Sequence, residues 1–466
     1  MTPAGLTDED EYFEAREAQL AQRLQHEHGL SRRELIKLGA AGSLLLGGAG
    51  AGAFGRPGRA VAADPPPATP IVKPLPPEWF TPIGTNAEMK WEAMQGQGYE
   101  TPNERFFVRN HTATPAIDAR TWRLRVFGSG LRHAEGIELS YRDLLRLPSR
   151  YEYAFIECAG NGRSFFTSQQ GTPAAGSQWK LGAVGVARWR GVPLREVLER
   201  AGIRRRAVDV LPQGLDATVI SGGVDTGHVR RPLSVDKALD DVLIAYEMNG
   251  RPLPPDHGFP ARLVVPGWVG IASIKWLGQI EVSDQPLFSP WNTTQYRMVG
   301  GDYPVDSPPL TKQQVKSAFE LPWDARLPAG GRLTLHGRSW SGDKPIRQVE
   351  VRVDPTPGPT AVAAHRGSDD DRGRRDHDHG DHDHHHWGDR GPGVNGGWQQ
   401  ARLQGPNLPH AWVRWSVDWR PPAAGGYQLS ARATDWAGTT QPDTVPFNTA
   451  GYQFWAIVRH PVTVAA

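Results

Sequence analysis

The sequence contains a single cysteine, Cys158, in 466 residues. One thiol cannot form a disulfide within its own chain, and a c-type haem is excluded because its attachment needs two cysteines and a histidine close together. The apolar residues 153–156 predict a strand that leads inward, which argues against an exposed thiol paired with another chain. Cys158 is therefore either a buried, inert residue or a ligand of a cofactor metal.

An excess of charge of one sign is also lacking, since 52 Lys and Arg against 50 Asp and Glu give a formal net charge of +2. We therefore expect no nucleic-acid partner. Glycine (53), proline (41) and tryptophan (17) are by contrast plentiful, which suits short strands and ordered loops better than long helices. The chain is too long for one ordinary core, so we expect two β-rich domains with tails.

Residues 1–63 have the features of an export signal. Arg32 and Arg33 precede an uncharged run rich in Gly and Ala at 38–54, and a small-residue cleavage site follows at 60–62. This pattern is typical of the twin-arginine route, which carries folded proteins, and it predicts a protein of the periplasm or cell envelope, or a secreted one. A membrane anchor is the alternative, although the run is short and only mildly apolar. Whether the signal is cleaved is left open.

The rest of the chain divides by its sequence patterns. Residues 64–100 begin proline-rich and predict an extended linker. From 101 to 290, short apolar runs alternate with turn signals and predict strands or strand ends at 105–111, 122–128, 153–158, 216–223, 241–250, 261–267 and 274–282. Together with helical patterns at 140–147 and 193–202, they predict a mixed α+β domain. Residues 291–315 show little periodicity and predict a connection.

Residues 316–466 alternate strictly between apolar and polar side chains in several runs. The pattern predicts half-buried antiparallel strands in a β-sandwich of immunoglobulin-like size. In the clearest run, one face carries Val413, Trp415, Val417 and Trp419, and the other carries Arg414, Ser416, Asp418 and Arg420.

A tract of Asp, Gly, Arg and His at 365–392 interrupts this domain. It has almost nothing apolar to bury, so we expect a disordered insertion at a hairpin tip. Histidine and carboxylate groups at this density bind Zn, Ni or Cu weakly, which makes a secreted metal-binding protein the non-enzymatic hypothesis. A solvated loop without function is the other interpretation, because a flexible tract fixes no coordination geometry. The histidines are His377, His379, His382, His384, His385 and His386.

Four short clusters in the first domain carry polar side chains beside apolar runs. Arg109 and His111 in "FVRNHTATP" share a face if this segment is a strand. The glycines of "ECAGNGR" permit a sharp turn that lets backbone N–H groups and Arg163 converge on whatever Cys158 holds. The remaining two clusters contain Asp216, Tyr246, His257, Arg262, Ser273 and Lys275.

Together these clusters place cations and N–H donors around one soft thiolate. A large anionic cofactor with a phosphate needs Arg, His, Lys and backbone donors, while its metal needs a soft ligand. A pterin-dithiolene molybdenum cofactor meets this description.

From about Glu104 to Val464 the chain resembles the sulfite oxidase family of molybdenum enzymes. The motifs "FVRNH", "ECAGN", "ARWRGVPLREVL", "AYEMNGRPLPPDHGFPARLVVPG" and "KWLG" occur in that family's order, followed by "QPDTVPFN". The resemblance implies an α+β fold: a mixed molybdopterin domain at 101–290, followed by an immunoglobulin-like dimerisation domain at 316–466. It therefore also implies a homodimer.

The resemblance also implies residue roles. Cys158 would ligate molybdenum. Arg109, Arg163 and Arg414 would form a cationic pocket for a small oxyanion, with Tyr246 and Trp179 alongside. Trp179 and Trp189 have a structural alternative as core residues, and Arg188 has one in an ion pair. The residues implied to hold molybdopterin are Phe107, Val108, Arg109, Asn110, His111, Arg188, Asp216, His257, Arg262, Ser273 and Lys275.

The chain departs from the family pattern in three places. Gly162 stands where the animal enzymes carry a second arginine, and the interval from Cys158 to Trp179 is longer here, which puts the role of Trp179 in doubt. The His-rich insertion has no counterpart in that pattern. No cytochrome-like haem domain accompanies the chain, so we expect no haem and a separate electron acceptor, for which a cytochrome c is a candidate.

The activity that the resemblance implies is oxidation of sulfite to sulfate. A sulfane dehydrogenase subunit, a nitrate reductase and a sulfoxide reductase are the alternatives within this group of enzymes. The second domain disfavours the sulfoxide reductase. A third pocket cation at Arg414 would favour sulfite over nitrate, because sulfite is the more highly charged anion. The physiological substrate among sulfur oxyanions is left open.

Replacing both Arg32 and Arg33 by Lys should block export, because the twin-arginine route reads the paired arginines. Immunoblots of cytoplasmic and exported fractions measure this, with the unaltered chain as control. Export of the double variant at the unaltered level would contradict the assignment of the signal.

Overall fold

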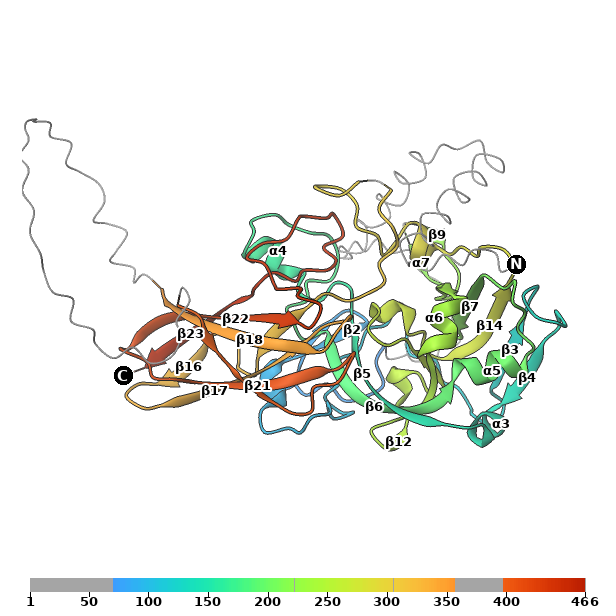
Figure 1. Ribbon diagram of the computed structural model, residues 1–466, viewed down its shortest axis with the longest axis horizontal. Coiled ribbons are helices and arrows are strands. Elements are labelled where there is room, and N and C mark those ends of the chain that lie inside the picture. Colours follow the sequence, from blue (N-terminus) through green and yellow to red (C-terminus); the bar gives the residue numbers. More distant parts are fainter. Residues whose placement is uncertain (1–69, 222, 305, 357–396, 466) are drawn as a thin grey trace, which may run out of the picture.

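The computed structural model describes residues 70–221, 223–304, 306–356 and 397–465. The predicted export signal at 1–63 and the His-rich tract at 365–392 lie outside these residues. Two bodies lie end to end along the long axis of the molecule, with β3, β4, β7 and β14 in one and β16, β18, β21 and β22 in the other (Figure 1). In the described residues, no helix is both long and apolar enough to cross a membrane.

The first body contains two five-stranded sheets. In one, β14 pairs in parallel with β3 and antiparallel with β7. Its order is β10 (Leu233–Ser234), β7 (Asp209–Gly214), β14 (Leu277–Ser283), β3 (Arg123–Phe127) and β4 (Ile137–Ser140). The other has the order β12 (Arg251–Pro252), β11 (Leu243–Met248), β6 (Val184–Pro193) and β5 (Arg150–Glu157), with β13 (Arg262–Val264) also paired to β11.

Both predicted helices of the first body are confirmed, as α3 (Tyr141–Arg146) and α5 (Leu194–Arg200). A capping box starts α3: the N–H of Asp143 donates to Ser140 Oγ at 3.2 Å, and the N–H of Ser140 donates to Asp143 Oδ2 at 3.0 Å, which satisfies backbone donors that the helix itself cannot. The remaining short helices are α4 (Ser164–Ser168), α6 (Val235–Asp240), α7 (Pro290–Thr293), η2 (Trp91–Met94), η3 (Pro255–His257) and η4 (Gly270–Ala272).

Two predicted strands of the first body are wrong. Residues 105–111 form only an isolated bridge between Val108 and Ala87, because this segment pairs with a neighbouring backbone at Val108 alone, although the side chains from Phe106 to Val108 are buried. Within 216–221, only Ile220 and Ser221 belong to a strand, the short β8 (Ile220–Ser221), which pairs with β9 (Val224–Asp225) in a small hairpin. The other predicted strands of this body are present.

The predicted linker at 64–100 is, over its described part, an integral segment of the first body. Its residues form β1 (Phe80–Ile83), β2 (Asn86–Met89) and η2. The apolar side chains between the prolines are buried, including Phe80, Met89 and Met94. This proline-rich stretch packs onto the first body because it carries apolar residues of its own. The prediction of a linker rested on its proline content and did not take these apolar residues into account.

The second body is a sandwich of two sheets around one apolar core, as predicted. Val413, Trp415 and Val417 on β21 point into that core, which confirms the alternating pattern. One sheet has the order β15 (Lys316–Phe319), β17 (Leu333–Trp340), β21 (Trp412–Trp419) and β20 (Arg402–Gln404). The other has the order β16 (Ala325–Pro328), β23 (Arg459–Ala465), β22 (Gly425–Asp435), β18 (Ile346–Pro355) and β19 (Gln399–Gln400).

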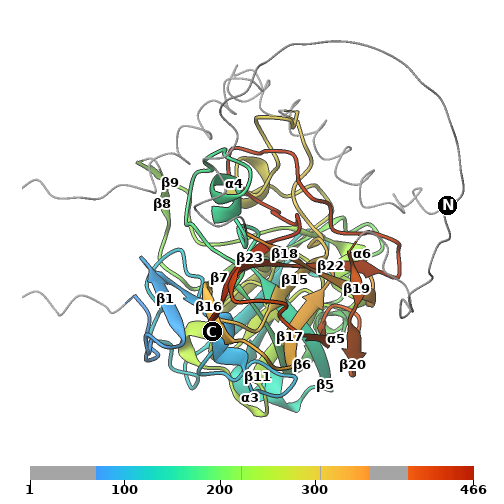
Figure 2. The same ribbon diagram turned by 90° about the vertical axis from the view of Figure 1, so that its left-hand side faces the viewer.

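Figure 2 views the molecule from the second body's end, with β16 and β23 near the C-terminus in front.

Segments of the second body contact the first body. The chain after β22 brings Phe454 against Phe165 and Phe166, with ring centroids 5.6 and 5.0 Å apart. From β17, buried Arg338 donates to the carbonyls of Gly98 and Tyr99, each at 3.0 Å. The two bodies therefore share both apolar and polar buried contacts.

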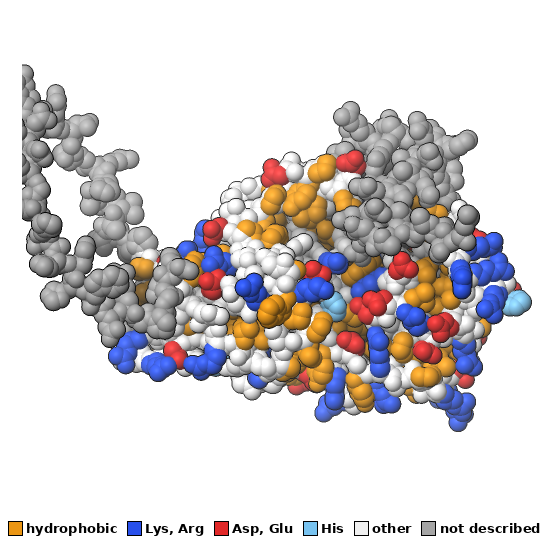
Figure 3. Space-filling view, viewed as in Figure 1, with side chains coloured by type: hydrophobic (Ala, Val, Ile, Leu, Met, Phe, Trp, Pro, Cys, Tyr) orange, Lys and Arg blue, Asp and Glu red, His pale blue; other side chains and the backbone are white. Residues whose placement is uncertain are grey.

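The surface carries charges of both signs. On the face that Figure 3 shows, Lys and Arg side chains are interspersed with Asp and Glu. This agrees with the near balance of 52 basic and 50 acidic residues in the sequence.

Stability should fall between pH 5 and pH 8 because of one buried carboxyl. Burial raises the pKa of Glu88 to about 7, although the N–H of Gly182 donates to its Oε1 at 2.9 Å. A folded-state pKa above the unfolded value means that the stabilising contribution is complete at low pH and is lost as pH rises through about 7. The loss is on the order of 3 kcal/mol.

Glu88→Gln should remove this part of the slope in the free energy of unfolding, measured by denaturant titration at pH 5 and pH 8. Glu78→Gln, at an exposed glutamate, is the matched control and should keep the wild-type slope. An unchanged slope in Glu88→Gln would assign the pH dependence to other groups.

Candidate active site

Two adjoining cavities meet where β5 ends. The inner cavity has a volume of about 80 Å³ and the outer one about 630 Å³. Five residues line both cavities, and Cys158 is one of them; the others are Arg109, Asn110, His111 and Tyr296. Cys158 therefore lies at the junction between the two spaces.

The turn after β5 presents the Cys158 side chain to these cavities. The N–H of Cys158 donates to Ala183 O at 3.0 Å, and its carbonyl accepts the N–H of Asn161 at 2.9 Å. Gly162 follows with φ +92°, a value that favours glycine, so the predicted sharp turn is present. The charge of the Arg109 guanidinium also interacts with the Cys158 sulfur, which contributes to raising the pKa of Arg109. Cys158 is thus mostly buried but faces a polar cavity, which argues against an inert core residue.

Arg109, His111 and Tyr296 form a linked group beside the cysteine. His111 Nε2 lies 3.1 Å from Arg109 Nη2 and 3.2 Å from Tyr296 Oη. Burial, with the nearby charges of Arg109 and Lys275, holds the pKa of His111 well below its usual value, so the ring is neutral. A neutral ring can accept at Nε2 from only one of these two donors at a time. The other donor is then available to an anion in the cavity.

Arg163 is fixed against the outer cavity by the second body. Its Nε donates to Ala450 O at 2.8 Å and its Nη1 donates to Ser177 O at 2.8 Å. The guanidinium carbon also lies 5.5 Å from the centre of the Tyr452 ring. Burial lowers the pKa of Arg163, yet an arginine stays charged at working pH. Arg109 and Arg163 therefore place two cations beside Cys158.

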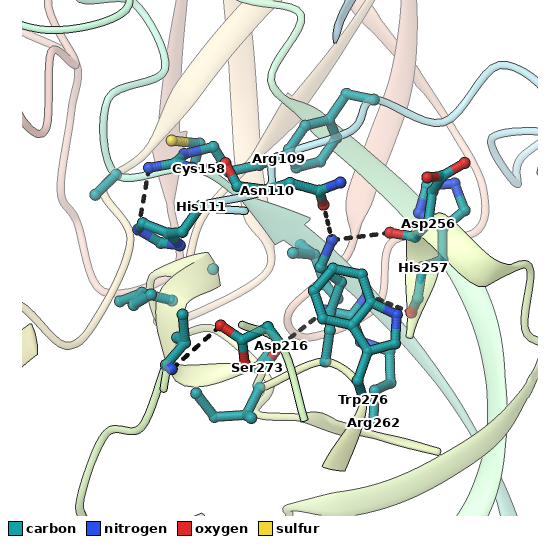
Figure 4. Close-up of a pocket in the computed structure, with 18 of the residues that line it drawn as sticks. Arg109, Asn110, His111, Cys158, Asp216, Asp256, His257, Arg262, Ser273 and Trp276 are labelled. Atoms are coloured by element: carbon teal, nitrogen blue, oxygen red, sulfur yellow. Dashed lines mark hydrogen bonds between the residues drawn. The ribbon is translucent and has the colours of Figure 1, made fainter. Parts of the chain in front are cut away.

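The inner cavity leads away from Cys158 towards a second group of polar residues. In Figure 4, Cys158 and Arg109 lie at one end and Asp256 and His257 at the opposite end, while a Lys275 bond to Asn110 links the two. Lys275 Nζ also donates to Asp256 O at 2.9 Å. Of the residues expected to hold a cofactor, Phe107, Arg109, Asn110, His111, Asp216, His257, Arg262, Ser273 and Lys275 line this space.

The charges in the inner cavity are poorly balanced. Burial lowers the pKa of Arg262 to about 9. Burial, together with the Arg262 charge, lowers the pKa of Lys275 well below its usual value. The pKa of His257 is likewise lowered by burial and by neighbouring cations. Among the described residues, His257 Nε2 and Asp216 Oδ1 are buried without a hydrogen-bond partner. Cations crowded in a buried space, with unsatisfied polar atoms, fit an anionic ligand that carries hydrogen-bonding groups.

A pterin with a phosphate fits this donor set. Arg262 fixes the wall through backbone carbonyls, because its Nη1 and Nη2 donate to His257 O at 3.0 Å and to Ser273 O at 2.9 Å. Lys275 and the His257 ring remain to meet the anion. Cys158 offers a soft ligand at the junction of the cavities, which suits a molybdenum centre.

Three residues expected at the site lie elsewhere. Tyr246 on β11 is buried in the apolar core of the first body. Val108 packs its side chain against Phe80 and Ala87. Arg188 on β6 is 41% exposed and lies 3.6 Å from Glu100, as its structural alternative predicts. None of the three lines either cavity.

Arg414 does not supply a third cation to the cavities. It lies on β21 directly opposite Arg338 of β17 and does not line either cavity. Side chains alternate strictly along β21, and Trp415 points into the sandwich core. The Arg414 side chain must therefore point to the opposite face of the sheet. The argument from three cations for sulfite over nitrate therefore loses its structural basis. Trp179, by contrast, is buried and does line the outer cavity.

Two tyrosines at the site were missed by sequence reasoning. Tyr296 lies in the segment predicted as a plain connection, and Tyr452 lies in the loop after β22; both line the outer cavity and stack with centroids 5.3 Å apart. Tyr296 could have been found from the aromatic residues near Trp291 in this aperiodic stretch. An aromatic-rich segment without periodicity indicates an ordered loop, and functional residues concentrate in such loops. Only the return of the chain from the second body brings Tyr452 there.

Comparisons with known proteins agree with this geometry. A family model described as "Oxidoreductase molybdopterin binding domain" matches residues 111–291. Sulfite oxidase of Gallus gallus is 34% identical over 387 residues, covering 77% of this chain and 72% of that protein. Mitochondrial sulfite oxidase of Mus musculus is 31% identical over 380 residues, covering 77% of this chain but only 60% of that protein.

A solved structure of the sulfane dehydrogenase SoxCD from Paracoccus pantotrophus is also similar. It superposes with a TM-score of 0.63 at 25% identity, over 88% of this chain and 96% of that one. The fold, the site and these relatives define the class of proteins that carry an oxidoreductase molybdopterin-binding domain. The chain belongs to the sulfite oxidase family.

Gly160→Ala should weaken anion binding through Arg163. A Cβ at position 160 would lie 2.6 Å from Arg163 Nη2 and 2.8 Å from its Cζ, so the guanidinium must move. Losing a hydrogen bond to a charged group should lower the affinity for sulfate by about ten- to a hundredfold. Calorimetric titration with sulfate measures this change.

Gly331→Ala is the matched control, because a Cβ there meets nothing within 4 Å. It should bind sulfate as the wild type does. Equal affinity in Gly160→Ala would show that Arg163 does not hold the anion.

Proposed function

We propose that this protein oxidises sulfite to sulfate, with Cys158 as the protein ligand of molybdenum and a separate protein as electron acceptor. The observation that carries the proposal is the position of Cys158, between a cavity suited to an anionic cofactor and one that holds Arg109 and Arg163. Membership of the sulfite oxidase family supports the same chemistry. The proposal includes export by the twin-arginine route, a homodimer and no haem in this chain.

The residues around Cys158 suit the binding of a small oxyanion. The planar forks of Arg109 and Arg163 can each pair with two oxygens and stay charged at every working pH. Two cations balance the charge of a dianion. Tyr296, which shares the single Nε2 acceptor of His111 with Arg109, can turn its hydroxyl proton to a substrate oxygen. The neutral His111 ring leaves the positive charge on the arginines.

When bound, the molybdenum cofactor would supply the oxygen transfer and take up the electrons. Lys275, His257, Ser273 and Asn110 would hold its anionic and hydrogen-bonding groups. The buried donors are fixed before any ligand arrives, and such preorganised dipoles stabilise developing charge without rearrangement. Trp179 and the stacked tyrosines form part of the wall of the outer cavity.

A sulfane dehydrogenase is the second candidate. The outer cavity, at about 630 Å³, is larger than a sulfite ion requires and leaves room for a longer sulfur substrate. The similar solved structure is a sulfane dehydrogenase. Nitrate is the third candidate, since the two arginines alone do not select against a singly charged oxyanion. The second body disfavours a sulfoxide reductase.

The non-enzymatic hypothesis rests on the His-rich tract outside the described residues. Within the described part of the chain, no group of three or more His, Cys, Asp and Glu side chains is arranged to hold a metal ion. A metal-binding role would therefore depend on 365–392 alone, whereas the molybdenum proposal does not involve that tract.

The purified protein should contain equimolar molybdenum and reduce ferricyanide with sulfite, and more slowly with thiosulfate. Nitrate, which has no electrons to give, should support no reduction of ferricyanide. Cys158→Ser should lower turnover by more than the roughly 10- to 100-fold typical of losing an outer partner of a metal site. Deletion of 365–392 is the control and should keep both molybdenum and turnover. Molybdenum-loaded protein that turns over thiosulfate but not sulfite would favour the sulfane dehydrogenase. Zn or Ni lost with the tract, and no molybdenum, would favour the metal-binding protein.

A further inference from the structure

Glu157, the residue before Cys158, forms a fully buried ion pair with the second body. Lys316 Nζ at the start of β15 lies 2.7 Å from Glu157 Oε1, and the two side chains are 1% and 0% exposed. Replacing such a pair by apolar residues is often neutral or stabilising, so burial of the charges needs another reason than stability. The position next to the cysteine suggests where to look for it.

The carboxylate of Glu157 is fully satisfied. Asn161 Nδ2 donates to its Oε1 at 2.8 Å, and Trp340 Nε1 donates to its Oε2 at 3.0 Å. Lys316 also donates to Asn161 O at 3.1 Å. One ammonium group therefore holds the chain on both sides of Cys158, at positions 157 and 161.

The backbone next to the cysteine is held as well. Gln313 Nε2 donates to Glu157 O at 2.8 Å, and the N–H of Ala183 donates to Asn161 Oδ1 at 3.0 Å. Gln313, Lys316 and Trp340 all come from beyond the first body. The turn that carries the thiol is thus fixed largely by the segment that leads into the second body and by the second body itself.

These anchoring residues do not contact the cavities. Glu157, Gln313, Lys316 and Trp340 are absent from the linings of both the inner and the outer cavity. They therefore act on the chemistry through the position of Cys158 and not by touching a ligand in the cavities. We propose that Lys316 is a positioning residue, through which the second body holds the Cys158 thiolate in its place between the cavities. The proposal rests on Cys158 as the metal ligand, but not on sulfite as the substrate.

The first test uses metal-free protein and the rate at which a maleimide labels Cys158. Because Cys158 is the only cysteine of the chain, labelling reports on this side chain alone. Lys316→Met removes the ammonium group with little change in volume. Labelling should become about tenfold faster, because local opening of the turn becomes easier by about 1.4 kcal/mol.

Arg338→Met is the matched control. Arg338 is another fully buried cation of the second body; its Nε donates to Glu320 Oε1 at 2.6 Å, and it also bonds first-body carbonyls, but it makes none of the contacts to 157–161. It should lose comparable stability, measured by thermal unfolding, while Cys158 labels at the wild-type rate. Equal acceleration in both variants would show general loosening and overturn the proposal.

The second test uses the molybdenum-loaded protein. Lys316→Met should change the paramagnetic resonance spectrum of the half-reduced metal and lower kcat by about 10- to 100-fold, with KM little changed, because the arginines stay in place. Gln313→Met, which removes only the amide that holds Glu157 O, should shift both readouts in the same direction to a smaller extent. If Lys316→Met does not fold, Gln313→Met provides the test of the proposal.

Wild-type labelling rates and wild-type spectra in both Gln313→Met and Lys316→Met would overturn the proposal. The thiol-labelling result stands apart from the substrate. If Lys316→Met labels faster and Arg338→Met does not, but the wild type does not oxidise sulfite, the proposed substrate fails while the role of Lys316 holds.

Discussion

The position of one sulfur atom depends on a buried ion pair between the two bodies. Glu157 ends β5, the next residue is Cys158, and Lys316 at 2.7 Å ties this strand end to β15 of the second body. A buried charge without its partner is strongly unfavourable, so this contact also constrains how the bodies join. The same junction brings Ala450 and Tyr452 onto Arg163. The sandwich is therefore part of the site, although it contributes few side chains to it.

The two cavities differ in the charge state of their lining residues. In the inner cavity, burial depresses the pKa values of Lys275, His257 and Arg262, which marks a space that a bound anion would stabilise. In the outer cavity, Arg109 and Arg163 keep their charge while His111 is neutral. The lining of the inner cavity thus suits an anionic cofactor by its charges and hydrogen-bonding groups, and the outer cavity holds two arginines that balance the charge of a small anion.

Sequence reasoning recovered much of this arrangement but not all of it. Most strands and two of the helices of the first body, α3 and α5, followed from apolar periodicity, and nine of the expected cofactor residues do line the inner cavity. Tyr246 and Arg414 were misplaced because a motif match does not show which face of a strand a side chain takes. Tyr296 and Tyr452 were missed because their segments have no periodic pattern, and the pairing of 157 with 316 links residues far apart in the chain.

The sequence by itself determined the chemistry that the chain can offer: one thiol, the turn glycines after it, and several cations. These residues lie in short motifs, and each motif largely fixes its own local backbone. It also determined the alternating faces of the sandwich, since burial on one face is a local property of each strand. Only the tertiary structure decided which cations meet at Cys158, that residues 71–100 belong to the first core, and that Lys316 reaches Glu157. Such contacts depend on packing between distant segments, where shape and burial, and not sequence spacing, select the partners.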